Sequence, residues 1–378
     1  MEREELAAWL RLTLAPGIGN ETARKLLRTF GLPAAIFSQA PAVLQQVVSP
    51  VQSEALRGEP LELTSQTLAA WAWLQDEPST RQIVVLGDPG YPASLLTIDD
   101  PPLLLYLMGR LDLVVDSSAS LAIVGSRNPT PQGALNARQF AQSLGQAGLT
   151  IVSGLALGVD AAAHEGALDA ASAELSQPAT IAVVGTGLDR VYPKSHLQLA
   201  HRIAERGLII SEYPLGTPPL AANFPRRNRL IAGLSCATLV VEATLKSGSL
   251  ITARLAADQG KEVFAIPGSI HSMQSHGCHA LIRQGAKLVE STQDVLEELP
   301  SAKELRSANS RAPDDTSDPA ASHDSLLEAI GFDPVSLDAL QARTGVDTAH
   351  LQAHLMTLEL SGDVARLPGG LFQRIVRT

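Results

Sequence analysis

The middle of the chain alternates short, continuously hydrophobic runs with longer amphipathic segments. The hydrophobic runs cover residues 120–126, 149–154, 179–187, 208–214, 237–243, 262–268 and 287–291. Strands that are hydrophobic on both faces and alternate with helices belong to parallel sheets that are covered on both sides. The pattern therefore predicts an α/β fold with a Rossmann-like, doubly wound parallel sheet.

The amphipathic segments between these runs have helical periodicity. The first begins at Pro131 and stops at Gly148, which are typical residues for the start and the end of a helix. The predicted helices cover residues 131–148, 159–171, 195–207, 227–235, 249–260 and 278–286. Each lies between two predicted strands, so we expect helices on both faces of the sheet.

The rest of the chain divides into further parts. Residues 1–75 have helical spacing and predict a small helical domain of the SAM-like type. Residues 80–298 form the Rossmann-like domain, which opens with an extended connector interrupted by prolines. Residues 299–323 are rich in Ser, Ala, Asp and Pro without periodicity, which predicts a flexible linker.

Residues 324–378 combine three predicted helices with a hairpin that turns at Pro368-Gly369-Gly370. Three helices followed by a two-stranded wing predict a winged-helix domain. The third helix, residues 347–362, contains two histidines and no Lys or Arg, whereas readers of the major groove normally carry basic residues there. We therefore expect this domain mainly to contact protein, or to serve as a weak duplex accessory, rather than to make the chain a duplex-binding regulator.

Composition and charge narrow the range of possible functions and cellular locations. The chain has 378 residues, of which 45% are hydrophobic and 4% aromatic, and its formal net charge is -10. Net acidity argues against indiscriminate coating of duplex DNA, although screening leaves local basic patches effective. The N-terminus is unlike a secretory signal, no hydrophobic run is long enough to span a bilayer, and Cys236 and Cys278 are the only cysteines. We expect a cytoplasmic protein without membrane association.

Small residues follow the predicted strands, at the sheet edge where parallel sheets bind ligands. Examples are Gly125-Ser126, Ser153-Gly154, Gly185-Thr186-Gly187 and Ser247-Gly248-Ser249. Backbone N–H groups in such loops approach anions closely, which suits phosphate. The G-x-G-x-x-G dinucleotide pattern and the G-x-x-x-x-G-K-[ST] P-loop are both absent, so we expect neither a nicotinamide cofactor nor a P-loop nucleotide.

The stretch NFPRRNRLIAGLS, residues 223–235, concentrates positive charge in this acidic chain. On a helix that begins near Pro225, the arginines at 226, 227 and 229 occupy the first turn, where the helix dipole is already positive. Such a local conflict is expected at a site that binds an anion. Asn228 can bond a base edge and Phe224 can stack a base. The alternative is a solvated basic turn on which Phe224 acts as a hydrophobic staple.

Several other polar residues near the strand ends can each be interpreted in more than one way. Arg127 can bind phosphate, or it can pair with a neighbouring acid such as Asp160 or Glu242. Asp160 and His164 are four residues apart, as in a metal pair, but no third ligand has suitable spacing, and a helix cap beside a histidine fits better. Glu242 is also a candidate general base. His196 and the other scattered histidines are interpreted as surface or loop residues.

The N-terminal part contains one further motif. Its turn Pro16-Gly17-Ile18-Gly19 resembles the hairpin of helix-hairpin-helix modules, in which glycines free backbone N–H groups to meet a phosphate. The motif is short, and an ordinary turn between two helices is the favoured interpretation.

Seven longer motifs follow one another in order across most of residues 80–290. They are AIVGSR (122–127), SGLALGVDAAAHEGAL (153–168), GTGLDRVYP (185–193), SEYPLGTPP (211–219), NFPRRNRLIAGLS (223–235), VVEATLKSGSLITARLAADQGKEVFAIPGSI (240–270) and GCHALIRQGAKLV (277–289). Together they resemble the bacterial DNA-processing protein A family (DprA, also called Smf). The helical and winged-helix parts on either side are similar to the family's usual arrangement.

The resemblance implies a protein that is not an enzyme and needs no cofactor or metal. It implies a homodimer, formed through the Rossmann-like domain, that binds single-stranded DNA in natural transformation (competence), shields it from nucleases and loads RecA recombinase on it. Carried over by motif, the DNA-binding residues are Gly125, Ser126, Arg127, Phe224, Arg227, Asn228 and Arg229, with Lys194, Lys246, Ser247, Gly248 and Ser249 as further backbone contacts. Arg226 occupies a variable position of the motif, and Ser153 and Gly154 are added from their place at a strand end.

The main alternative is an enzyme, a nucleotide-processing hydrolase of the lysine-decarboxylase-like phosphoribohydrolase type, built on a similar sheet. Such enzymes carry P-G-G-x-G-T-x-x-E at a strand–helix junction, where this chain has EATLKSGSLITA. No Ser-His-Asp or Cys-His order stands out either, so the sequence favours the DNA-binding interpretation.

Overall fold

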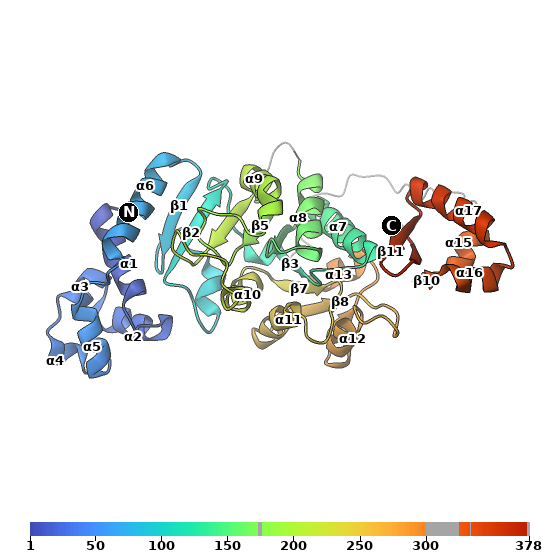
Figure 1. Cartoon of the computed structure of the whole chain (residues 1–378). Helices are drawn as coiled ribbons and strands as arrows, with labels where there is room; N and C mark the ends of the chain where they lie inside the picture. Colours follow the sequence, from blue (N-terminus) through green and yellow to red (C-terminus); the bar gives the residue numbers. More distant parts are fainter. Residues whose placement is uncertain (173–175, 300–324, 333, 376–378) are drawn as a thin grey trace.

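The central feature of the molecule is one mixed sheet with helices on both faces (Figure 1). The computed structural model describes residues 1–172, 176–299, 325–332 and 334–375. Within these ranges, the strands of this sheet lie in the order β1-β2-β6-β5-β4-β3-β7-β8-β9. Their bounds are β1 Arg81–Val85, β2 Leu104–Gly109, β3 Ser120–Val124, β4 Thr150–Ser153, β5 Thr180–Val183, β6 Leu208–Ser211, β7 Ala237–Val240, β8 Glu262–Ala265 and β9 Lys287–Leu288.

The predicted doubly wound fold is confirmed. Strands β3 to β9 pair in parallel, whereas β1 and β2 pair antiparallel with each other, and β2 continues antiparallel onto β6. These two edge strands come from the connector that the sequence predicted only as extended. From β3 the chain winds outward through β4, β5 and β6 on one side, and β7 then starts on the other side of β3. The crevice between β3 and β7 is the place where such sheets bind ligands.

The helices cover the two faces of the sheet as separate hydrophobic layers. Their bounds are α7 Pro131–Gln146, α8 Val159–Ala170, α9 Leu197–Arg206, α10 Asn223–Gly233, α11 Ser249–Asp258, α12 His276–Arg283 and α13 Thr292–Glu298. One layer contains side chains of α7, α8 and α13, and the other contains side chains of α10, α11 and α12. The carboxyl ends of β3 and β7 are therefore framed by α8 from one layer and by α10 and α11 from the other.

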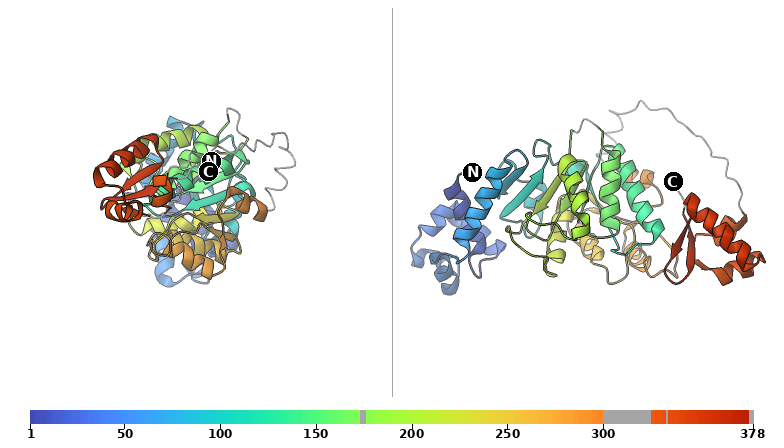
Figure 2. Two further views of the ribbon diagram at one scale, coloured as in Figure 1. Left: turned by 90° about the vertical axis from the view of Figure 1, so that its right-hand side faces the viewer. Right: turned by 45° about the horizontal axis from the view of Figure 1, so that its top comes forward.

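The N-terminal helices pack directly on the β1–β2 edge of the sheet, as the right-hand view of Figure 2 shows. They are α1 Arg3–Leu14, α2 Asn20–Phe30, α3 Pro33–Phe37, α4 Pro41–Leu44, α5 Pro50–Arg57 and α6 Leu63–Asp76. Trp9 and Leu10 of α1 share one hydrophobic cluster with Tyr106 of β2 and Ile203 of α9. This continuous core fixes the position of the helical part relative to the sheet.

The C-terminal part has its own hydrophobic cluster and a three-stranded sheet in the order β10-β12-β11. Its elements are α15 Ser325–Ile330, β10 Val335–Ser336, α16 Leu337–Thr344, α17 Thr348–Ser361, β11 Val364–Leu367 and β12 Leu371–Arg374. The predicted winged helix is confirmed, with β10 as an additional strand beside the wing. The predicted linker, residues 299–323, lies outside the described residues except for residue 299. The exact domain boundaries stay predictions.

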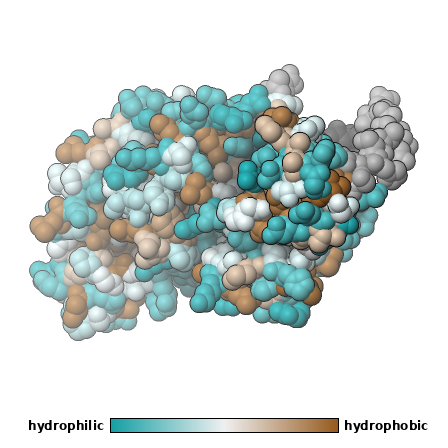
Figure 3. All heavy atoms as spheres, turned by 45° about the vertical axis from the view of Figure 1, so that its right-hand side comes forward, coloured by the Kyte–Doolittle hydropathy of each residue, from teal (hydrophilic) through white to brown (hydrophobic). Residues whose placement is uncertain are grey.

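The surface carries both hydrophobic and hydrophilic residues. On the face shown in Figure 3, hydrophobic residues are interspersed with hydrophilic ones. Across the ranges described above, none of the helices is sufficiently long and apolar to pass through a lipid bilayer.

Candidate nucleic-acid interface

A cavity of about 620 Å³ opens at the carboxyl ends of β3 and β7, where the winding direction of the sheet changes. We call it the switch-point cavity. It is lined by Gly125, Ser126, Arg127 and Asn128 after β3, Ala156 and Asp160 after β4, Phe224, Pro225, Arg227 and Asn228 of α10, and Ser247, Gly248 and Ser249 around the start of α11, among other residues. The structure thus brings together most of the residues that the sequence assigned to DNA binding.

Glycine at position 125 is required by close packing at this point. A Cβ on Gly125 would lie 2.8 Å from Cγ2 of Val159 and 2.9 Å from the carbonyl oxygen of Glu242. These separations are shorter than any ordinary carbon contact, so a side chain there would push apart the end of β7 and the start of α8. The glycine therefore keeps the loop after β3 close to both neighbours, with Ser126 and Arg127 at the cavity.

The rim of the switch-point cavity is formed by an exposed arginine and two aromatic rings. The guanidinium carbon of Arg127 lies 5.6 Å from the ring centre of Phe224. The rings of Phe224 and Tyr192 are 5.5 Å apart and tilted by 39°. Arg127 makes no salt bridge with any residue that the structure describes, so the pairing with Asp160 or Glu242 considered above is not observed. A cation and two aromatic faces at one opening suit a phosphate and an unstacked base.

Arg227 has a different environment from the one that the sequence predicted. Its side chain is buried, with 4% of the residue exposed, and Nη1 donates hydrogen bonds to the carbonyl oxygens of Gly154, at 2.6 Å, and Val183. Its Nη2 lies 3.9 Å from the carboxylate of Asp160. Burial lowers the pKa of Arg227, and the charge of Asp160 acts in the opposite direction. The structure holds this arginine without an outside anion, because carbonyl groups at the ends of β4 and β5 accept its hydrogen bonds and the carboxylate of Asp160 lies near its charge.

Gly154 makes this burial possible. A Cβ on Gly154 would lie 2.1 Å from Nη2 of Arg227, so any side chain at this position would displace the guanidinium. The adjacent Ser153 is fully buried, and its hydroxyl donates to the carbonyl oxygen of Ile123 at 2.7 Å. The structure therefore places Ser153 inside the sheet and not at the cavity, and gives Gly154 a supporting place behind Arg227.

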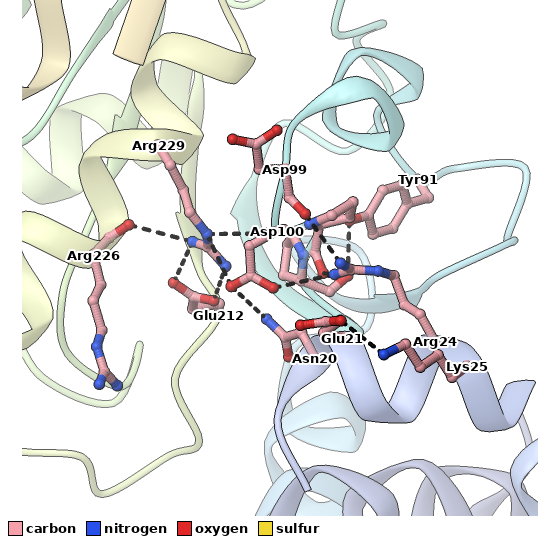
Figure 4. Close-up of polar contacts among 12 residues, drawn as sticks. Asn20, Glu21, Arg24, Lys25, Tyr91, Asp99, Asp100, Glu212, Arg226 and Arg229 are labelled. Atoms are coloured by element: carbon pink, nitrogen blue, oxygen red, sulfur yellow. Dashed lines mark hydrogen bonds and ion pairs between the residues drawn. The ribbon is translucent and has the colours of Figure 1, made fainter. Parts of the chain in front are cut away.

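The remaining two arginines of the stretch point to the other side of α10. Arg229 is held by both carboxylate oxygens of Glu212, at 2.7 and 2.6 Å, and its Nε donates to the carbonyl oxygen of Asp100 at 2.9 Å. Arg226 is exposed, and its guanidinium has no hydrogen bond or salt bridge to the described part of the chain. Figure 4 shows the Arg226 side chain directed away from the Glu212–Arg229 pair. Of the three arginines, Arg226 is the one whose charge is not already satisfied by the protein.

The loop between β4 and α8 is fixed by two histidines for which the sequence did not predict this role. Nε2 of His164 accepts a hydrogen bond from the Leu155 backbone at 3.3 Å, and Nδ1 donates to the hydroxyl of Thr180 at 2.7 Å. Nδ1 of His196 contacts the carbonyl oxygen of Leu155 at 3.1 Å. Leu155 itself has a φ of 57°, an unusual value for a residue other than glycine. His196 is thus a half-buried anchor of this loop and not a free surface residue.

Glu242 and Asp160 are both structural acids. Glu242 accepts hydrogen bonds from the backbone N–H of Thr130 at 2.8 Å and from its hydroxyl at 2.7 Å, and so holds the residue that caps the start of α7. It does not line the switch-point cavity, so the candidate role as general base has no geometric support. Asp160 accepts a hydrogen bond from the backbone N–H of Ala156 at 3.3 Å, and burial raises its pKa.

In the described ranges, no three His, Cys, Asp or Glu residues are placed to share a metal ion.

The loop before α11 approaches α10 across the cavity. Nδ2 of Asn228 donates to the carbonyl oxygen of Gly248 at 3.3 Å, and the hydroxyls of Ser247 and Ser249 lie 2.7 Å apart. Lys246 and Lys194 are exposed outside the lining of the cavity. They are therefore available to a strand that continues beyond the opening.

Asn128, Tyr192 and Gln274 are among the lining residues that the sequence did not assign to the site. They lie at the opening, and Nε2 of Gln274 donates to the carbonyl oxygen of Asn128 at 2.9 Å. Tyr192 belongs to the motif GTGLDRVYP (185–193), and the scarcity of aromatic residues in this chain was a usable signal for it. No comparable signal exists for Gln274, because its loop joins the cavity only through the tertiary fold.

The fold and the site define a class: a Rossmann-like protein with a winged helix, a switch-point cavity suited to phosphate and bases, and no dinucleotide fingerprint. The chain belongs to the DNA recombination-mediator protein A family, whose model matches residues 82–300. A second model, the DprA winged helix domain, matches residues 310–370. The family expected from the motifs is confirmed.

Relatives of known structure or description agree with this assignment. Protein Smf of Escherichia coli strain K12 is 41% identical over 306 residues, which cover 79% of this chain and 78% of the relative. The X-ray structure of DNA processing protein A from Streptococcus pneumoniae has a TM-score of 0.62 at 37% identity, covering 79% of this chain and 98% of that one. A structure of DNA processing protein A from Helicobacter pylori, described for its single-stranded DNA binding mode, has a TM-score of 0.51 at 33% identity, covering 60% and 97%.

The burial of Arg227 leads to a prediction about stability. Arg227→Ala would leave the carbonyl oxygens of Gly154 and Val183 without their donor and the buried Asp160 without its cation. Removal of one partner from a buried pair typically costs about 3–5 kcal/mol, so we expect a clear fall in the free energy of unfolding. Denaturant unfolding followed by circular dichroism measures it. The neighbouring Arg226→Ala is the control, and equal stabilities of the two variants would contradict the structural role.

His164 leads to a prediction about pH. Burial lowers its pKa to about 3, compared with about 6.5 in an unfolded chain. Between these values the unfolded state binds a proton that the folded state does not, so the free energy of unfolding falls as the pH falls, by up to ~1.4 kcal/mol per pH unit from this group. We expect His164→Gln to flatten the dependence of the denaturant midpoint on pH between 6 and 4. The exposed His201→Gln is the control, and parallel curves for all three proteins would refute this role.

Proposed function

We propose that this protein binds single-stranded DNA in the switch-point cavity and processes incoming DNA in natural transformation. The observation that carries the proposal is the rim formed by Arg127, Phe224 and Tyr192, where an exposed cation lies against the Phe224 ring and makes no salt bridge with any of the described residues. The description of the Helicobacter pylori relative by its single-stranded DNA binding mode supports the same assignment.

The two parts of a nucleotide have separate partners at this rim. Arg127 offers a planar guanidinium to a phosphate, and the Gly- and Ser-rich loops after β3 and before α11 offer backbone N–H groups. An aromatic face stacks any base, at about 1–3 kcal/mol per base, and therefore does not select sequence. An acidic protein can bind a polyanion in this way because the charge that matters is local.

We divide the expected DNA-binding residues into two groups according to how far interactions within the protein already hold their polar groups. Residues proposed to contact the strand are Gly125, Ser126, Arg127, Lys194, Phe224, Arg226, Asn228, Lys246, Ser247, Gly248 and Ser249. Residues proposed mainly to support the site are Ser153, Gly154, Arg227 and Arg229, because hydrogen bonds within the protein hold the Ser153 hydroxyl, the Gly154 carbonyl and the guanidinium groups of the two arginines.

The finer parts of the proposal follow from family membership. We infer that the protein is not an enzyme, that it shields single strands from nucleases and loads RecA recombinase on them, and that it acts as a cytoplasmic homodimer without a cofactor. The winged helix would mainly contact protein, since α17 carries histidines and no Lys or Arg in the position of a recognition helix.

The first functional prediction concerns Arg127. We expect Arg127→Ala to weaken the binding of oligothymidylate more than tenfold, because a phosphate loses its guanidinium partner and Phe224 its cation. The fold should persist, since Arg127 is exposed. Fluorescence anisotropy at fixed salt measures the affinity. Arg202→Ala removes the same charge from the exposed surface of α9 and serves as the control. Equal affinities of the two variants would refute the proposed function.

The second functional prediction concerns salt. Each phosphate neutralised on a single strand contributes about -0.7 to the slope of log K against log salt concentration. We therefore expect Arg226→Gln to make the slope less steep by about 0.7, because its guanidinium is exposed and unpaired. A salt titration of oligothymidylate binding measures the slope. An unchanged slope would show that Arg226 contacts no phosphate.

A further inference from the structure

A second cavity of about 560 Å³ lies between the N-terminal helices and the Rossmann-like core. We call it the interdomain cavity. Thr13, Gly19 and Asn20 line it from the helical part. The core contributes the start of β2, the segment after β6 and two arginines of α10. Its volume lies in the range of sites that hold small organic molecules.

The two cavities lie on opposite sides of the same helical segment. Pro225 and Arg227 of α10 line the switch-point cavity, whereas Arg226 and Arg229 line the interdomain cavity. Residues in this segment lie within about one helical turn, which rises ~5.4 Å. A strand that leaves the switch-point cavity on this side therefore crosses α10 beside Arg226 and reaches the interdomain cavity.

The acidic groups at the interdomain cavity are already paired, as Figure 4 shows. The carboxylate of Asp100 accepts hydrogen bonds from Asn20 and from Arg24 of α2, both at 3.1 Å. Glu212 is bound by Arg229 through both oxygens. Arg226 is the cation that lacks such a partner in the described structure. A phosphate is therefore attracted to the Arg226 side of the cavity, and the two carboxylates disfavour a second phosphate deeper inside.

The interior has the chemistry of a site for a base. Leu103, Leu104 and Pro214 supply apolar walls, and the half-buried Tyr213 supplies an aromatic ring. Tyr106 also lines the cavity, is only 1% exposed, and its hydroxyl has no hydrogen-bond partner among the described residues. A buried hydroxyl without a partner is rare, because it has lost its hydration without replacement. A base that displaced the atoms covering this hydroxyl would offer it a ring nitrogen or carbonyl oxygen as the missing acceptor.

The helical part adds donors to the same cavity. Helix α2 begins at Asn20, and its N-cap residue Gly19 has no side chain to bond the first backbone N–H groups. These groups have no partner within the helix and attract negative charge. The glycine turn that resembled a helix-hairpin-helix motif thus ends at the wall of this cavity.

We propose that the interdomain cavity holds one nucleoside of the same single strand, with the adjoining phosphate on Arg226. The helical part then takes a direct share in DNA binding. This inference rests on the proposed function, because the strand enters from the switch-point cavity.

The test uses the full-length protein with Gly19→Asp and its matched control Gly19→Asn. A Cβ on Gly19 would meet no atom within 4 Å, its φ is -83°, and Asp and Asn are both good N-cap residues, so both variants should fold. The Asp variant differs by one negative charge at the cavity wall. Affinities are measured by anisotropy for oligothymidylates of about 4 and about 20 nucleotides, a range that spans typical single-strand site sizes.

We expect Gly19→Asp to bind the long oligonucleotide about fivefold more weakly than Gly19→Asn does, with the short one unaffected. Arg127→Ala in the same experiment should weaken both lengths. Equal affinities of the two Gly19 variants for the long oligonucleotide would overturn the inference while the Arg127 result upholds the proposed function. If Arg127→Ala also changes neither affinity, the proposed function itself fails.

Tyr106→Phe provides a second variant. It removes only the unpartnered hydroxyl, so the free energy of unfolding should stay the same or rise. We expect the long oligonucleotide to bind about threefold more weakly and the short one to bind unchanged. An unchanged affinity for the long oligonucleotide would overturn the placement of a base beside Tyr106.

Discussion

The site depends on one buried interaction, the hydrogen bonds from Arg227 to the carbonyl oxygens of Gly154 and Val183. These carbonyls stand at the ends of β4 and β5, so the guanidinium ties α10 to two neighbouring strands at once. Asp160 lies close enough to compensate part of the charge. A buried cation without such partners would be strongly unfavourable, and the geometry is therefore well defined. Because α10 is fixed in this way, Phe224 and Asn228 lie at the switch-point cavity and Arg226 lies on the far side of the helix.

This arrangement explains how three arginines can stand within four positions of an acidic chain. Each arginine has a different environment because consecutive residues of a helix point in different directions. Arg227 donates to backbone carbonyls through Nη1, Arg229 pairs with the carboxylate of Glu212, and Arg226 faces solvent. The protein thus uses its own acids and carbonyls to build the framework of the site. The charge that is left for a ligand comes from Arg226 at the interdomain cavity and from Arg127 at the switch-point cavity.

The sequence predicted those features that leave a local pattern along the chain, and missed those that depend on contacts between distant residues. Hydrophobic runs such as 237–243 report burial on both faces, so the parallel sheet and its helices were predictable. The loops after the strands were predictable as well, because each loop directly follows a hydrophobic run that predicts a strand. The burial of Arg227 was not, because the charge of an arginine predicts exposure and its partners are about 44 and 73 residues away in the sequence. Likewise, no local pattern shows that His164 and His196 hold the two sides of Leu155, since those contacts arise only in three dimensions.

The ion-pair chain at Asp100 connects the two parts of the molecule that line the interdomain cavity. Arg24 and Asn20 of the helical part bind one carboxylate, and Arg229 binds the backbone of the same residue. Asp100, in the segment between β1 and β2, thereby links α10 to α2. Arg226 and Arg227 point in different directions and have different surroundings. The hydrogen bonds of Arg227 nevertheless set the position of Arg226, because both residues belong to α10. A strand that engages the switch-point cavity would therefore meet a helical part already held in register with α10, and the cost of ordering that second contact would be low.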